Sequence, residues 1–132
     1  MKKSASKFIL VPLALLLFST QCEENIPPIT MENEQKELAV LKAEIENLAS
    51  ISICDDTFEC EFLAFGSKPC GGPWSYLVYS TSIDTEKLEK MVIGYNQKEA
   101  LYNKNWNINS DCIIVNPPTS ITCENNTCIA VY

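Results

Sequence analysis

The sequence predicts an α+β fold in which a small antiparallel sheet of about five to six short strands carries one long central helix. Three observations favour this class. A helical pattern covers residues 84–104, short runs rich in β-branched and aromatic residues lie on both sides of it, and six cysteines fall within residues 51–132. Helices and strands that are segregated along a chain are typical of α+β domains. We therefore expect residues 51–132 to form an α+β domain that is stapled by three disulfides.

Residues 1–21 have the pattern of a lipoprotein signal peptide. Three lysines precede an unbroken apolar run from Phe8 to Phe18, which is too short for a membrane span of about 20 residues. A short polar exit then leads to Cys22. We expect the Cys22 thiol to be the lipid attachment site, so that the protein is exported and its acyl chains join it to a membrane. The outer membrane is the expected location, with the cell surface as the further possibility.

Composition limits the partners and the chemistry. Residues 22–132 contain 7 lysines and 17 acidic residues, a net charge of −10, and the chain has no arginine and no histidine. Nucleic acid requires basic side chains to neutralise its phosphates, so we expect no nucleic-acid partner. Without histidine, neither a Ser-His-Asp nor a Cys-His catalytic arrangement can form. We therefore expect a protein that is not an enzyme and that binds no cofactor.

Residues 22–30 are acidic and contain two prolines, which predicts a tether. Thr30 is a candidate N-cap for a helix over 31–50. Its apolar seam consists of Met31, Leu38, Leu41, Ile45 and Leu48. Two interpretations stay open: this helix packs on its own domain or serves as a stalk, or it pairs with another helix over 31–49 as a short coiled coil.

Short β-like runs follow at 51–54, 60–65 and 74–79, and a loop with two prolines and three glycines separates the last two. Within the stretch 66–76, the candidate binding residues are Lys68, Pro73, Trp74 and Tyr76. Exposed aromatic residues make good binding anchors. The alternative is that Trp74 and Tyr76 fill a small core that needs every large apolar side chain.

The sequence of this loop resembles a motif of small cysteine-containing exported lipoproteins of the Bacteroidota. The matching run is Gly66-x-Lys68-x-Cys70-Gly71-Gly72-Pro73-Trp74-x-Tyr76. The C-x4-C pair near the end of the chain looks similar as well, so that the resemblance covers residues 54–128. It carries no known activity. It implies that Glu23 and Glu24, directly after Cys22, direct the protein to the cell surface.

The central helix over 84–104 has clear start signals. Asp84 is a candidate N-cap, and Ile83 and Leu88 have the spacing of a hydrophobic staple. A further strand is expected at 112–115, because four strand-forming residues precede Asn116-Pro117-Pro118.

The last strands, over 121–123 and 128–132, flank a turn at Asn125-Asn126, since Asn tolerates positive φ. This register places Cys123 opposite Cys128 in a non-hydrogen-bonded pair, where side chains approach most closely. We therefore favour a disulfide between Cys123 and Cys128. The sequence gives no physical basis for pairing the other four cysteines.

Seven cysteines are an odd number, and assigning Cys22 to the lipid leaves six. The expected disulfide cysteines are Cys54, Cys60, Cys70, Cys112, Cys123 and Cys128. The competing interpretation is zinc, which favours C-x2-4-C spacings and often histidine. The acidic cluster at Asp55, Asp56, Glu59 and Glu61 offers carboxylates, but such clusters are most often solvated turns. We expect no metal.

These inferences favour a lipid-anchored envelope or cell-surface protein that acts as a non-catalytic binding module. One form would be inhibitor-like, with residues 66–76 as the contact loop. The alternative is a structural envelope lipoprotein that self-associates through the 31–49 helix.

Overall fold

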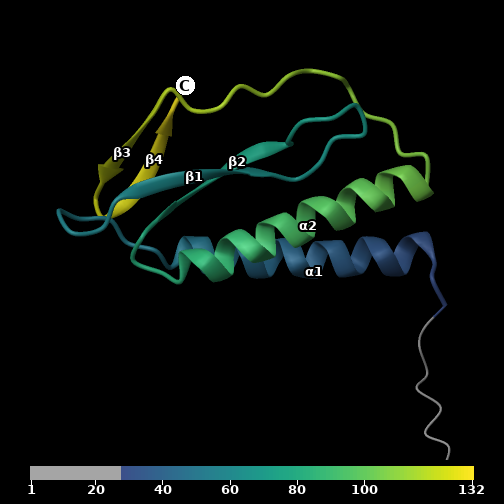
Figure 1. Cartoon of the computed structure of the whole chain (residues 1–132), viewed down its shortest axis with the longest axis horizontal. Coiled ribbons are helices and arrows are strands. Elements are labelled where there is room, and N and C mark those ends of the chain that lie inside the picture. Colours follow the sequence, from purple (N-terminus) through teal and green to yellow (C-terminus); the bar gives the residue numbers. More distant parts are fainter. Residues whose placement is uncertain (1–27) are drawn as a thin grey trace, which may run out of the picture.

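Two antiparallel helices form one layer of the structure, and a β-hairpin lies over them (Figure 1). The computed structural model describes residues 28–132. Helix α1 spans Met31–Ser50 and helix α2 spans Thr85–Asn105. The strands are β1 (Cys60–Phe65), β2 (Ser75–Ser80), β3 (Ser120–Glu124) and β4 (Thr127–Val131). The predicted signal peptide, Cys22 and most of the tether lie outside the described residues.

Both helices begin at the predicted caps. The Thr30 side chain accepts a hydrogen bond of 3.2 Å from the backbone N–H of Asn33. The Asp84 carboxylate accepts one of 2.9 Å from the backbone N–H of Lys87. These bonds satisfy N–H groups that the first turn of a helix leaves without a partner.

Helix α1 is part of the core of the domain. Two residues of its predicted seam, Leu38 and Ile45, are buried against α2 and the β1–β2 hairpin. The full core cluster is Leu38, Ile45, Ala49, Phe65, Tyr79, Leu88, Val92 and Tyr95. The interpretation of 31–50 as a stalk outside the 51–132 domain is therefore wrong, and packing on its own domain is the alternative that holds.

The expected sheet of five to six strands is instead two separate antiparallel hairpins, β1–β2 and β3–β4. The run at 51–54 is not a strand, because the N–H of Ile53 donates to the Ser82 hydroxyl and that of Cys54 to the Asn126 carbonyl. The run at 112–115 has no regular structure either. The α+β class is confirmed, with four strands among residues 28–132.

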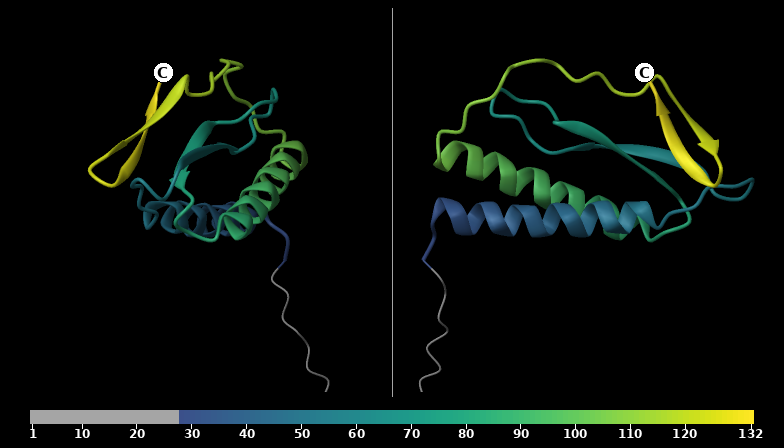
Figure 2. Two further views of the ribbon diagram at one scale, coloured as in Figure 1. Left: turned by 60° about the vertical axis from the view of Figure 1, so that its left-hand side comes forward. Right: turned by 180° about the vertical axis from the view of Figure 1, so that it is seen from behind.

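The second hairpin has the predicted turn and register. Asn125 and Asn126 have φ angles of 50° and 61°, which type I′ turns require. Cys123 faces Cys128 across the two strands. Figure 2 shows that β3–β4 lies at one end of the molecule, beside the first hairpin.

The described part of the chain contains three disulfides, as predicted: Cys54–Cys123, Cys60–Cys128 and Cys70–Cys112, with Cα–Cα distances of 5.9, 5.7 and 5.6 Å. The favoured Cys123–Cys128 pairing is wrong. Cα atoms of a non-hydrogen-bonded pair lie about 4.5 Å apart, whereas disulfides prefer about 5.5–6 Å. The sulfurs of Cys123 and Cys128 lie on one face of β3–β4. They bond instead to Cys54, before β1, and to Cys60, within β1.

Three disulfides indicate an oxidising, extracytoplasmic compartment. Among residues 28–132, no helix combines the length and apolar character that crossing a bilayer demands.

Candidate functional site

The loop between β1 and β2, residues 66–74, lies at the end of the molecule where α2 ends (Figure 1). Side chains on one face of α2 hold its backbone. Asn96 Oδ1 accepts a hydrogen bond of 2.7 Å from the N–H of Gly66, and Glu99 Oε2 accepts one from the N–H of Ser67. Asn103 Nδ2 donates one of 2.7 Å to the carbonyl oxygen of Ser67. These bonds anchor the loop to α2.

Internal hydrogen bonds fix the rest of the loop. The N–H of Lys68 donates to the Gly72 carbonyl at 2.8 Å, and the N–H of Gly71 donates to the Lys68 carbonyl at 2.9 Å. Gly71 and Gly72 have φ angles of 93° and 82°, which side-chain-bearing residues rarely adopt. The N–H of Trp74 donates to the Phe65 carbonyl at 3.0 Å and closes the loop.

Lys68 joins the loop to the segment that follows α2. It is buried, with only 7% of its surface exposed. Its Nζ donates to the carbonyl oxygen of Ile113 at 2.7 Å and to Asp111 Oδ1 at 3.1 Å, and lies 5.0 Å from the centre of the Trp74 ring. Lys68, one of the candidate binding residues, is therefore a buried link between the loop and this segment and does not face solvent.

A hollow of about 300 Å³ lies between the loop and this segment. Its lining residues are Cys70, Gly71, Gly72, Pro73, Cys112, Ile113, Ile114 and Val115. The Cys70–Cys112 disulfide forms part of its wall, and both cysteines are exposed. We call this hollow, with the side chains of Trp74, Ile113 and Ile114, the disulfide surface.

The disulfide surface is apolar and open to solvent. Trp74 is 41% exposed, Ile113 67% and Ile114 84%. Tyr76 is half-buried, and its ring packs edge-on against Phe62 with centroids 5.6 Å apart. Neither Trp74 nor Tyr76 belongs to the buried core cluster. The two alternatives for these aromatics were exposure as binding anchors and burial in the core. Trp74 is exposed, and Tyr76 packs on the outer face of the hairpin.

Sequence reasoning missed Ile113 and Ile114 as exposed residues, because the apolar run 112–115 was predicted to be a strand. It also missed Asn96 and Glu99. Their spacing with Asn103, along one edge of the apolar face of α2, was a usable signal for polar contacts to a neighbouring loop.

The acidic residues lie in two different places. Asp55 Oδ1 accepts hydrogen bonds from the N–H groups of Thr57 (2.7 Å) and Phe58 (3.0 Å), which makes the cluster's first member part of an exposed turn. Glu61 accepts a hydrogen bond of 2.9 Å from the hydroxyl of Tyr79. Burial, and secondly this bond, raise the pKa of Tyr79 above its ordinary value. The carboxylates of Asp55 and Glu61 thus have structural partners.

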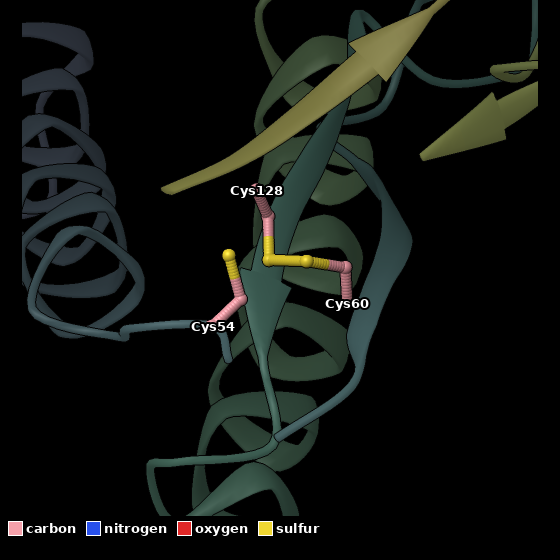
Figure 3. Close-up of side chains that lie close together, drawn as sticks. All are labelled: Cys54, Cys60 and Cys128. Atoms are coloured by element: carbon pink, nitrogen blue, oxygen red, sulfur yellow. A yellow bond between two sulfur atoms is a disulfide. The ribbon is translucent and has the colours of Figure 1, made fainter. Parts of the chain in front are cut away.

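The closest grouping of metal-type ligands in residues 28–132 is made of sulfur. The Sγ atoms of Cys54, Cys60 and Cys128 lie within 4.8 Å of one another (Figure 3). All three are in disulfides, and metals bind the thiolate form of cysteine. In this oxidised state the grouping offers no thiolate ligand.

Comparison with known proteins gives no match to a family model, to a curated protein or to a solved structure. The resemblance of residues 54–128 to exported lipoproteins therefore stays a prediction.

Proposed function

We propose that the chain is an exported, lipid-anchored, non-catalytic protein that binds an extended segment of a partner polypeptide at the disulfide surface. The observation that carries this proposal is the exposure of Ile113 and Ile114 beside the hollow. Exposed apolar patches on a small protein are typical of contact sites. Fully burying one side chain of this kind contributes about 1.5–3 kcal/mol.

The rigidity of the surface favours binding. The Cys70–Cys112 disulfide, the α2 side chains and the Lys68 contacts all hold it in place. A flexible loop loses conformational entropy when it binds a partner. A surface that is already ordered avoids this cost. This is also the property that an inhibitor-like contact loop requires.

The backbone of the segment favours an extended polypeptide as the partner. Within the described part of the chain, residues 109–118 form no hydrogen bond with another backbone group. The backbone N–H groups of 113–115 are thus free for an added strand, as in β-augmentation. The hollow would receive a side chain of that strand, and Pro117 and Pro118 would limit the pairing because they lack an N–H.

The predicted lipid would keep this surface close to a membrane. The indole N–H of Trp106, at the end of α2, donates to the carboxylate of Glu34 in the first turn of α1. The chain therefore enters α1 at the same end of the molecule as the loop 66–74 (Figure 1). A tether over residues 22–30 would span at most about 30 Å, which favours an envelope protein as the partner.

The structural alternative, self-association through the 31–49 helix, has less support. Leu38 and Ile45 of the seam are buried in the core of the same chain. A second helix would have to displace α2 to reach them.

Site-specific photo-crosslinking in intact cells tests this proposal on the full-length chain. A photoreactive residue at Ile114 is expected to give one discrete adduct with an envelope protein. The matched control is Val40, which is 57% exposed on α1 and is expected to give none. Adding Ile113→Asp should abolish the adduct from position 114. Equal adducts from both positions, or none from 114, would show that the disulfide surface is not a contact site.

A further inference from the structure

Two of the three disulfides lie side by side. Figure 3 shows the sulfur of Cys128 between those of Cys60 and Cys54, and these three atoms lie within 4.8 Å of one another. Cys128 is bonded to Cys60, whereas Cys54 is bonded to Cys123. The Cys54 sulfur therefore lies beside a disulfide to which it does not belong.

The register of the β3–β4 hairpin produces this arrangement. Cys123 and Cys128 are opposite each other, so their side chains project from the same face of the hairpin. One bonds to Cys54, just after α1, and the other to Cys60, at the start of β1. Because the hairpin partners are neighbours, the two disulfides are neighbours as well.

We propose that Cys54, Cys60, Cys123 and Cys128 form a site of thiol–disulfide exchange, at which an external thiol causes the two disulfides to trade partners. The reactant class is a monothiol, which enters and leaves unchanged. No net oxidation or reduction takes place.

The exposure of the cysteines indicates which sulfur the external thiol attacks. Cys123 is exposed and Cys128 is half-buried, whereas Cys54 is only 1% exposed. Exchange proceeds by attack of a thiolate on one sulfur of a disulfide, and access decides which sulfur is attacked. The external thiolate bonds to the Cys123 sulfur, the Cys54–Cys123 bond breaks, and Cys54 leaves as a thiolate.

The second step stays within the protein. The Cys54 thiolate attacks the Cys128 sulfur, from the side opposite to Cys60 in the arrangement of Figure 3. A Cys54–Cys128 bond forms, the Cys60–Cys128 bond breaks, and Cys60 leaves as a thiolate. Cys60 then attacks Cys123, forms a Cys60–Cys123 bond and releases the external thiolate. The hairpin stays covalently attached throughout.

The Cys123→Ser variant tests the second step. It leaves Cys54 as a thiol beside the Cys60–Cys128 disulfide. Alkylation of the folded, full-length variant is expected to label Cys60 as well as Cys54, because exchange transfers the free thiol to Cys60. The matched control, Cys112→Ser, frees Cys70, and only Cys70 is expected to be labelled. Labelling of Cys54 alone in Cys123→Ser would overturn the proposal.

The wild-type full-length chain provides a measurement that does not depend on how the variant folds. It is incubated with a sub-stoichiometric monothiol, acid-quenched and digested with a glutamate-specific protease. Cleavage after Glu59 and Glu124 separates Cys54 from Cys60 and Cys123 from Cys128. Peptides that link Cys54 to Cys128 are expected to appear only after thiol is added. Retention of the Cys54–Cys123 link alone, at every thiol concentration, would contradict the exchange.

Discussion

Lys68 Nζ donates a 2.7 Å hydrogen bond to the backbone carbonyl oxygen of Ile113, forty-five residues further along the chain. This bond and the Cys70–Cys112 disulfide connect the same two segments. Together they hold Ile113 and Ile114 outward, on a segment that forms no backbone ladder of its own. The apolar surface is therefore exposed because of specific contacts beneath it.

Replacing Lys68 by methionine is expected to lower the free energy of unfolding by about 2 kcal/mol, as for a buried hydrogen bond to a charged group. The ion pair with Asp111 adds little, because the Asp111 side chain is 60% exposed. Urea unfolding measures the change. The control is Lys104→Met, at an exposed position in the last turn of α2, which should stay within about 0.5 kcal/mol of wild type. Equal losses of stability in both variants would show that the buried contacts of Lys68 do not stabilise the fold.

Gly66→Ala should destabilise the protein, whereas Gly94→Ala should stabilise it. Gly66 has φ of +83°, and an added Cβ would lie 2.7 Å from Cδ1 of Trp74. The left-handed conformation alone costs about 1–2 kcal/mol for other residues. Gly94 lies within α2 with nothing within 4 Å of an added Cβ, so alanine should contribute about 0.5–1 kcal/mol. Opposite shifts of the urea midpoint are expected, and shifts of the same sign would contradict this account.

The contributions of the neighbouring disulfides to stability should be non-additive by about 1 kcal/mol. Cys54–Cys123 and Cys60–Cys128 span 69 and 68 residues, so either one closes the same long loop. Removing one as a double alanine variant should cost about 3 kcal/mol, because only a short extra loop opens, and removing the other afterwards about 4 kcal/mol. Urea unfolding of both double variants and of the quadruple variant measures the difference. Simple additivity would show that the two do not share a loop.

Stability should fall at alkaline pH. Burial and the nearby carboxylates of Glu61 and Glu99 raise the pKa values of Tyr79 and Tyr95 above their ordinary value of 10.0. Below this pH both tyrosines are protonated in the folded and unfolded states, so the stabilisation is fully present. Above it the unfolded chain releases protons that the folded protein retains, and the free energy of unfolding decreases.

The melting temperature at about pH 9 and about pH 11 tests this. Tyr79→Phe should lose less stability over this interval than wild type, because one of the two shifted groups is absent. Tyr132→Phe is the control, since Tyr132 is 71% exposed. An identical decrease in all three proteins would mean that Tyr79 does not cause the alkaline loss.

Local features of the sequence predicted a large part of this fold. Thr30 and Asp84 mark the helix starts because capping depends on the neighbouring three residues. Asn125 and Asn126 set the β3–β4 register because turn geometry does so without help from the rest of the chain. The candidate loop was likewise visible in its prolines and glycines.

Features that depend on distant segments were not predictable. The run 112–115 has strand composition, but the Cys70–Cys112 bond places it along a loop that offers no strand edge. The exposure of Ile113 and Ile114 is a consequence of that disulfide. Cys123 faces Cys128 as expected, yet each sulfur bonds to a cysteine more than sixty residues away. Only the packed hairpins determine which sulfurs meet.

The pairing of the six cysteines tests the account most directly, since both the disulfide surface and the exchange site depend on it. Non-reducing digestion of the full-length chain after glutamate residues, followed by mass spectrometry, measures it. The expected links are Cys54 to Cys123, Cys60 to Cys128 and Cys70 to Cys112. A link between Cys123 and Cys128, or free thiols at Cys70 and Cys112, would contradict it.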